Sequence, residues 1–325
     1  MSLGSGLSAQ LGFAEESVYG TYVAPTRFLP FDREALRLNI ERDEFAGSIG
    51  ETGTVLRSDR WAAGARNVSG EIALKVLTRG FGMLFRHMLG AVAISTPGGA
   101  TLTRDHTHTL ANLLPLSLTA QVGRPGVTGP VRPFSYLGCK IAEWTLSNAL
   151  KGFLEIELSI DGRNEDTVPT LAAASFPSGA VPLHWAGGSV TVAGAAFPLH
   201  EITINCNNGL EGDRYHLSSN VKSPPLHERL REITGEMVAE FTDLQAYNRF
   251  VTGAHAGIVA TWTGPIIEST FNNHVQVTLP VCRFDGETPR VDGHGRLMQR
   301  LPFKVLNDGT QQPITLVYRT ADVAS

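Results

Sequence analysis

The feature that most constrains this 325-residue chain is an internal repeat. Residues 67–76 alternate polar and apolar side chains with the period of two that is typical of a half-buried strand. An apolar stripe at helical spacing then runs from Thr78 to Gly90, and the same pattern recurs at 233–238 and from Thr242 to Gly253. Each copy predicts a strand and then a short helix that begins at its threonine and ends at its glycine. The predicted stripes are Phe81, Leu84, Phe85, Met88 and Leu89 in the first helix, and Leu244, Tyr247, Phe250 and Val251 in the second.

Two pairs of matching residues give nearly the same separation between the two copies. Asn39 and Asn205, which lie in similar strand-like segments, are 166 positions apart, and Gly70 and Gly235 are 165 positions apart. We interpret the chain as a duplicated, mainly β protein with two tandem β-sandwich or barrel domains, each flanked by one short helix.

The domain boundary is predicted at residues 165–180, which contain Pro169, Pro177 and a run of alanines between periodic segments. A weaker echo of 116–120 at 275–279 extends the repeat downstream. The predicted units are an N-terminal arm at 1–26, a first domain at 27–168 and a second domain at 169–325. The arm is small-residue-rich, so we expect it to lie on the body of the protein or on a neighbour.

Composition excludes several classes of protein. A formal net charge of -4 with 18% charged residues does not indicate a nucleic-acid-binding surface, and 34 Gly and 18 Pro with 42% hydrophobic residues suit turn-rich β structure. No apolar run is long enough to cross a bilayer, so no membrane partner is predicted. The odd number of cysteines favours buried free thiols in a reducing compartment, at Cys139, Cys206 and Cys282.

Two long charged segments without periodicity, 42–67 and 209–231, occupy equivalent places in the two copies. Loops of this length in a compact domain usually make contacts, so their duplication suggests a repeated contact in an assembly. The candidate contact residues are Arg42, Asp43, Glu44, Arg57, Asp59 and Arg60 in the first loop, and Glu211, Asp213 and Arg214 in the second.

A hairpin is predicted from 141–148 and 153–161, because the two segments alternate in phase. Its apolar face comprises Trp144, Leu146, Ile156, Leu158 and Ile160, and its polar face comprises Glu143, Thr145, Ser147, Glu155, Glu157, Ser159 and Asp161. A matching hairpin is predicted from 301–305 and 314–319, with a polar face that carries Arg300, Lys304 and Arg319 instead of carboxylates.

Two pairs of residues could carry chemistry, namely Glu155 with Glu157 and His106 with His108. Glu155 and Glu157 lie roughly 6.5 Å apart along one strand face, which is compatible with glycoside hydrolysis. Neither has an apolar setting or a companion nucleophile, so a solvated face is favoured. His106 and His108 would face one side of a strand, but no third ligand lies beside them in sequence, and we predict a surface hairpin there. No catalytic residue, metal or cofactor is predicted.

An extended series of short motifs resembles the tail tube (major tail) protein of long-tailed, non-contractile bacteriophages. The motifs are residues 12–21 (GFAEESVYGT), 26–31 (TRFLPF), 57–61 (RSDRW), 68–70 (VSG), 123–125 (GRP), 159–163 (SIDGR), 208–210 (NGL), 214–215 (RY), 233–235 (ITG) and 283–289 (RFDGETP). They span nearly the whole chain in order.

The resemblance implies a structural virion protein and no enzyme. Such proteins form rings that stack into a hollow tail tube, through which DNA passes on ejection without specific binding. Two tube domains in one chain imply trimeric, pseudo-hexameric rings, with a hexamer of chains as the alternative. The polar face of the 141–161 hairpin would line the lumen, where carboxylates repel the DNA backbone. Expected partners are further copies, the tape-measure protein and the tail terminator, and the expected location is the virion tail, after assembly in the host cytoplasm.

The main alternative is a carbohydrate-binding or adhesive β-sandwich of a virion or cell surface. That class would expose aromatic platforms, whereas the tryptophans mostly lie in apolar alternation, at Trp61, Trp144, Trp185 and Trp262.

Overall fold

The structure, a computed structural model, describes residues 4–45, 55–286, 288–291 and 293–325. It is mainly β, and two antiparallel sheets share one strand. The smaller sheet follows the order β2 (Arg27–Phe28), β1 (Gln10–Glu15), β8 (Leu118–Pro125), β9 (Val131–Ala149) and β11 (Asn164–Asp166). The predicted N-terminal arm therefore contributes a strand to this sheet, and Leu11 and Phe13 of β1 are buried.

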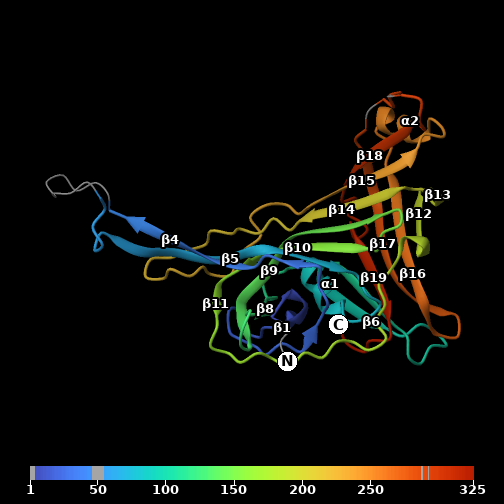
Figure 1. The fold of residues 1–325 in the computed structure, drawn as a ribbon. Helices are drawn as coiled ribbons and strands as arrows, with labels where there is room; N and C mark the ends of the chain where they lie inside the picture. Colours follow the sequence, from blue (N-terminus) through green and yellow to red (C-terminus); the bar gives the residue numbers. More distant parts are fainter. Residues whose placement is uncertain (1–3, 46–54, 287, 292) are drawn as a thin grey trace.

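The larger sheet runs the length of the molecule (Figure 1). Its central order is β4 (Arg37–Glu44), β5 (Trp61–Lys75), β10 (Glu155–Gly162), β9, β14 (Glu201–Asn207), β15 (Glu232–Glu240), β18 (Met298–Val305) and β17 (Phe271–Phe284). The short β3 (Arg33–Glu34) also pairs with β5. One edge of β17 pairs with β16 (Ala256–Glu268), which pairs with β12 (Gly188–Val192) and so leads to β13 (Ala195–Ala196). The other edge of β17 continues to β19 (Thr315–Thr320), β7 (Arg104–Leu110) and β6 (Gly90–Ser95).

The two halves of the chain repeat one strand order. The pairings β4–β5–β10–β9 in the first half have the counterpart β14–β15–β18–β17 in the second. Each half places one α-helix after its second strand, α1 (Gly82–Leu89) after β5 and α2 (Gln245–Thr252) after β15. A 3-10 turn lies at Gly6–Ser8 and another at Trp185–Gly187.

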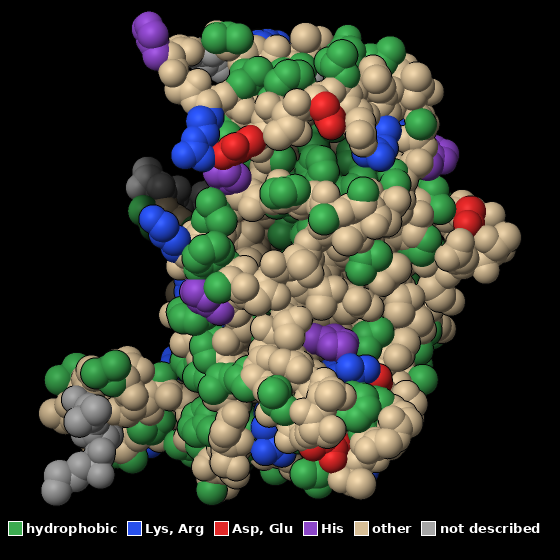
Figure 2. Space-filling model, turned by 90° about the vertical axis from the view of Figure 1, so that its right-hand side faces the viewer, with side chains coloured by type: hydrophobic (Ala, Val, Ile, Leu, Met, Phe, Trp, Pro, Cys, Tyr) green, Lys and Arg blue, Asp and Glu red, His purple; other side chains and the backbone are tan. Residues whose placement is uncertain are grey.

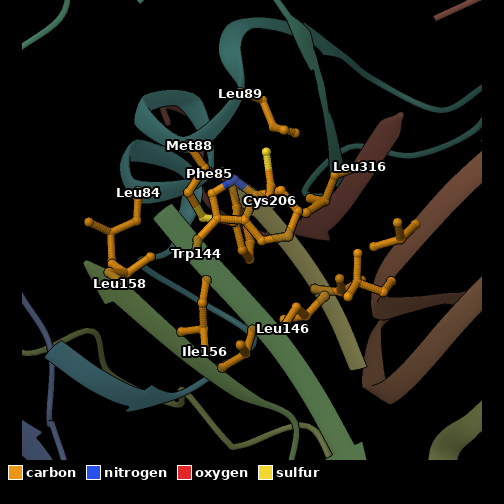
Figure 3. Packing of buried hydrophobic residues seen from close by; sticks show 14 of the residues in the cluster. Leu84, Phe85, Met88, Leu89, Trp144, Leu146, Ile156, Leu158, Cys206 and Leu316 are labelled. Atoms are coloured by element: carbon orange, nitrogen blue, oxygen red, sulfur yellow. The ribbon is translucent and has the colours of Figure 1, made fainter. Parts of the chain in front are cut away.

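The halves are joined at two places. The C-terminal part of β9 pairs with β14, so the two four-strand units form one continuous sheet. The hairpin β6–β7 of the first half pairs with β19, near the C-terminus. The buried hydrophobic side chains accordingly form one cluster that spans both halves. Figure 3 shows a part of that cluster, in which Leu84 and Phe85 of α1 lie over Trp144 and Leu158.

Several predictions about single elements are wrong. Both helices begin later than their threonines, at Gly82 and Gln245. The Thr78 hydroxyl instead accepts a hydrogen bond from the backbone amide of Val181. The glycine stops are confirmed, and Gly253 takes the left-handed conformation with a φ of 68°.

The alignment of the repeat is two residues out of register in its first strand. Asn39 pairs with Asn67, and the residue that takes this place beside β15 is Asn207, not Asn205. A slip of two keeps every side chain on the same face of a strand, so the alternation could not reveal it. The echo of 116–120 at 275–279 equates β8 with β17, which the chain order does not support. Apart from the β6–β7 hairpin, β8 is the first strand after α1, and the first strand after α2 is β16.

The predicted hairpin of 301–305 with 314–319 is not formed. Both segments are strands, β18 and β19, but each pairs with β17 and not with the other. In the structure, the counterpart of the β9–β10 hairpin is therefore β17–β18 and not the predicted pair. The loop predicted at 42–67 is shorter than expected, since β4 extends to Glu44 and β5 begins at Trp61.

Candidate assembly surfaces

One face of the larger sheet is polar and the other is buried. On β9 and β10 the predicted alternation is confirmed: Ser147, Thr145 and Glu143 pair in register with Glu155, Glu157 and Ser159. The intervening Trp144, Leu146, Ile156 and Leu158 are at most 2% exposed. A bulge follows Ser159, and the remaining candidate, Asp161, lies beyond it.

Asp161 is distinct from the other six residues. It forms an ion pair with the ammonium group of Lys222, whose side chain is only 1% exposed. Burial raises the pKa of Asp161, and the charge of Lys222 opposes that rise. Asp161 therefore anchors the 209–231 segment against β10 and is half-buried itself, whereas Glu143 and Glu155 are exposed.

The acidic strip on β9 and β10 is not bare. Arg33 lies within ion-pair distance of both Glu157 and Glu71 of β5. Lys75 pairs with Glu155 and with Asp32. These ion pairs join β3, β5 and β10 across the polar face.

The basic residues of β18 are paired in the same manner. Arg300 Nη1 lies 2.6 Å from Glu236 Oε1, and Lys304 pairs with Glu232, both on β15. Arg319 lies elsewhere, on β19, where its guanidinium forms two hydrogen bonds with Asp105 of β7. The expected contrast between an acidic and a basic half is therefore absent, and both halves carry a mixed face.

Carboxylates still outnumber cations on this face. The strand positions that alternate with the buried residues carry Glu71, Glu143, Glu155, Glu157, Glu201, Glu232, Glu236 and Glu240, against Arg33, Arg37, Lys75, Arg283, Arg300 and Lys304. Uncharged side chains lie between them, for example Thr145, whose hydroxyl donates to Asn205 Oδ1 at 2.8 Å. Such a face is hydrated and net negative.

The strands β4 and β5 extend beyond the body as a long hairpin (Figure 1). Arg42, Asp43 and Glu44 are exposed near its far end, where the guanidinium of Arg42 lies 5.3 Å from the ring centroid of Trp61. Part of the segment between the strands, 46–54, lies outside the described residues.

The other three predicted contact residues of this hairpin form one ionic group. Arg57 forms two hydrogen bonds with Asp59, at 3.0 and 2.9 Å, and Arg60 Nη1 lies 3.4 Å from the same carboxylate. The bond from Arg57 lowers the pKa of Asp59.

The second charged segment, 209–231, lies along the base of that hairpin instead of projecting by itself (Figure 1). The Tyr215 hydroxyl donates to the Arg66 carbonyl at 3.1 Å, and the Arg66 amide donates to the Asn220 carbonyl at 2.8 Å. Of the predicted contact residues, Asp213 is exposed, while Glu211 and Arg214 are half-buried and bonded within the loop. The two charged segments are thus brought together within one chain.

The face formed by β12, β13 and β16 has a different character. Few Lys, Arg, Asp or Glu side chains are visible on it, and neutral and apolar side chains cover most of the area (Figure 2). A pocket lined by Trp185, Phe197 and Trp262 lies there. Glu155 and Glu157, the pair considered for hydrolysis, do not line this pocket.

His106 and His108 are buried, so the surface hairpin predicted for them is wrong. They lie on β7 beneath α1, where His108 packs edge-on against Phe85 and His106 against Tyr318. Burial, together with the nearby His106 and Arg86, lowers the pKa of His108 to about 3. Within the described part of the chain, no group of three or more His, Cys, Asp or Glu residues is placed to hold a metal ion.

Two buried charged residues were not found from the sequence. Glu16 accepts hydrogen bonds from Gly20 N, Gly138 N and the hydroxyls of Ser117 and Thr119, and so ties the N-terminal strand to the smaller sheet. Lys140 donates to the carbonyls of Leu113, Leu114 and Leu116. Burial lowers the pKa of Lys140 to about 8, although Glu16 and Asp161 oppose this. Glu16 lies within the 12–21 motif, but nothing in the local pattern marks a carboxylate as buried.

The aromatic residues give little support to a carbohydrate-binding surface. Trp144 and Trp262 are each 2% exposed, and the indole nitrogen of Trp262 donates to the buried Asn148. Trp61 is exposed at the far end of the β4–β5 hairpin, where Arg42 lies over its ring. The three cysteines are buried free thiols, as predicted.

The described residues thus present an extended sheet with one polar face and a projecting hairpin, both of which are surfaces available for contact with other molecules. The chain belongs to the phage tail tube protein family, whose family model matches residues 6–305. It is therefore a structural protein of a phage tail, and the proteins of this family self-assemble into a tube. No curated protein matches the chain. Among the described residues, no helix is both long and apolar enough to cross a membrane.

Proposed function

We propose that three copies of this chain close into a pseudo-hexameric ring, and that stacked rings form the tube through which DNA is ejected. The observation that carries this proposal is the repeated strand order, β4–β5–β10–β9 followed by β14–β15–β18–β17, in one continuous sheet. Each chain thus supplies two equivalent wall units, corresponding to domains 27–168 and 169–325. A ring of six chains, with twelve such units, is the alternative.

The polar face of the sheet is the proposed lumen wall. A cationic wall would bind phosphates and release their counterions, which holds DNA in place. Here Arg33, Lys75, Arg300 and Lys304 are each paired with a carboxylate of the same face, and carboxylates outnumber cations there. The candidate lumen residues Glu143, Thr145, Ser147, Glu155, Glu157 and Ser159 lie on this face, whereas Asp161 serves the ion pair with Lys222. DNA would pass without a specific contact.

The β4–β5 hairpin is the proposed contact between successive rings. It projects beyond the body and exposes charged groups at its far end. The proposed further partners are the tape-measure protein within the tube and the terminator at its end. Assembly would take place in the host cytoplasm, and the expected virion is of the long-tailed, non-contractile kind.

Charge reversal on the lumen face tests the proposal. Virions that carry Glu143→Lys and Glu157→Lys together should assemble tubes of normal width but eject DNA severalfold more slowly at low salt. The added cations bind phosphates, so raising the salt concentration should restore the rate. The measurement is dye fluorescence of released DNA after triggering. Glu228→Lys, at an exposed position of the 209–231 segment, is the matched control. A lumen variant with the control's ejection rate at all salt concentrations would contradict the assignment of this face.

Ring composition is a separate measurement. Native mass spectrometry of single rings should give the mass of three chains, whereas a single ring with the mass of six chains would favour the alternative.

A further inference from the structure

The two helices of the repeat are equivalent in sequence position but differ in burial. Both are eight residues long and end at a glycine, Gly90 or Gly253, so Phe81 corresponds to Leu244 and Met88 to Val251. Phe81 and Met88 are fully buried, whereas Leu244 is 56% exposed and Val251 is 60% exposed. Among the described residues, nothing covers Leu244 and Val251 of the apolar stripe predicted for α2 to a comparable extent.

The body of α1 packs on β6, β7 and β9 of its own half, and its C-terminal end is bonded by residues of the second half. Asn208, at the end of β14, donates its side-chain amide to the Met88 carbonyl at 3.2 Å. Arg231, just before β15, donates to the Leu89 carbonyl at 2.9 Å. These two donors bond carbonyls at the C-terminal end of α1, which no later turn of the helix satisfies. Cys206 of β14 lies beside Met88 and Leu89 (Figure 3).

The strand register of the first half identifies the residues that correspond to Asn208 and Arg231. Val68 and Gly70 of β5 correspond to Ile233 and Gly235 of β15, so Arg66 corresponds to Arg231. Ile40, which pairs with Arg66, then corresponds to Asn208. Ile40 is 39% exposed, and the buried Nε atom of Arg66 has no hydrogen-bond partner. Among the described residues, β4 pairs only with β5, whereas β14 has β9 as its second neighbour.

The chain thus carries one docked pair of surfaces and one undocked pair. The 209–231 segment bonds the backbone of Arg66 on the β5 side, so the open surfaces are α2 and the free edge of β4 at the base of the hairpin. They lie far apart and do not meet within one molecule (Figure 1). We infer that the β4 edge of one copy contacts the C-terminal end of α2 of the next copy, as Asn208 and Arg231 bond the C-terminal end of α1 within the chain. The occupant of the α2 surface is a second copy because the chain itself contains the complementary surface. A head-to-tail contact of this kind closes into a ring or extends as a chain.

This inference rests on the proposed ring and names its subunit contact. In the contact, Ile40 lies near Val251, and Arg66 approaches the last carbonyls of α2. The contact uses the base of the hairpin, which leaves its far end for the next ring.

Two charge substitutions test the contact from its two sides. Val251→Glu on α2 and Ile40→Glu on β4 should each abolish tubes in negative-stain images and leave a monomer with an unchanged urea midpoint, because both side chains are exposed. Val127→Glu, at a residue that is 89% exposed elsewhere, is the matched control and should form tubes.

Mixing the two blocked variants is the decisive step. The Val251→Glu protein keeps an intact β4, and the Ile40→Glu protein keeps an intact α2, so one contact can form but cannot propagate. Sedimentation should therefore show a one-to-one dimer in the mixture and monomers in either sample alone. Monomers in the mixture would overturn the pairing of these two surfaces.

A crosslink provides an independent readout. A chain with both Ile40→Cys and Val251→Cys should form covalent multimers under mild oxidation, whereas Val127→Cys with Val251→Cys should not. If wild-type protein forms tubes and both charge variants do too, the inference fails while the proposed function stands. If wild-type protein forms neither rings nor tubes, the proposed function itself fails.

Discussion

Gly70 and Gly235 occupy equivalent places where a neighbouring strand leaves no room for a side chain. A Cβ atom on Gly70 would lie 2.2 Å from the Ala35 carbonyl oxygen, and one on Gly235 would lie 2.4 Å from the Thr203 carbonyl oxygen. Both glycines are therefore required by packing, Gly70 against the residues just before β4 and Gly235 against β14 and the Phe303 ring of β18. This explains why the sequence repeat is clearest around them.

At the same scale, His108 gives the fold a dependence on pH. Its pKa is about 3 in the folded chain, where burial opposes protonation, and about 6.5 in the unfolded chain. The unfolded state thus binds more protons between these values, so stability is lost as the pH falls below about 6.5. We expect this group to cost about 2–3 kcal/mol of unfolding free energy on going from pH 7 to pH 4.5.

His108→Leu should remove that part of the pH dependence, as measured by urea denaturation at the two pH values. His216→Leu, at an exposed position, is the control and should keep the slope of the wild type. Equal slopes for all three proteins would show that His108 does not titrate as described.

At the scale of elements, the projecting hairpin is separable from the body. The base of β4–β5 is held by its own ladder and by the bond from Tyr215 to Arg66. Replacing residues 45–60 by an Asn-Gly turn should therefore change the unfolding free energy by less than about 1 kcal/mol, because loop length alone has a weak effect. The same replacement should abolish stacked tubes in negative-stain images.

A length-matched Gly/Ser replacement of residues 45–60 separates contact chemistry from reach. It should also fail to form tubes if the side chains make the ring-to-ring contact. Tubes of normal length from the Asn-Gly variant would exclude the hairpin as that contact.

The elements also show what a sequence pattern can and cannot convey. The strand alternation of Trp144 and Leu146 against Glu143 and Thr145 fixed their faces, because the period of two depends only on the local chain. The stripe of α2 had the same local pattern as that of α1, yet its burial depends on whether another surface is present. Pairings such as Lys222 with Asp161 depend on the path of a long loop and left no local signal.

At the scale of the whole molecule, the two repeats do not form independent bodies. β7 of the first half needs β19, β9 needs β14, and the buried cluster crosses the boundary at 168. We expect one cooperative unfolding transition, with tryptophan fluorescence and far-ultraviolet circular dichroism giving the same urea midpoint. A fragment of residues 1–168 should not fold stably alone, since it leaves the apolar surface around Phe85 uncovered.

Two transitions with separate midpoints would contradict this expectation. Co-expression of 1–168 with 169–325 is the appropriate control, because it restores both strand pairings without a covalent link.

The β6–β7 hairpin belongs to only one of the two repeats. It follows α1 and pairs with β19, whereas β16 follows α2 with no hairpin between them. In a ring of three chains, the bore would thus present six similar wall units while the outside alternated between two kinds. Transported DNA would pass a wall of approximate sixfold symmetry. A protein that binds the ring through β6–β7 would have three equivalent binding sites.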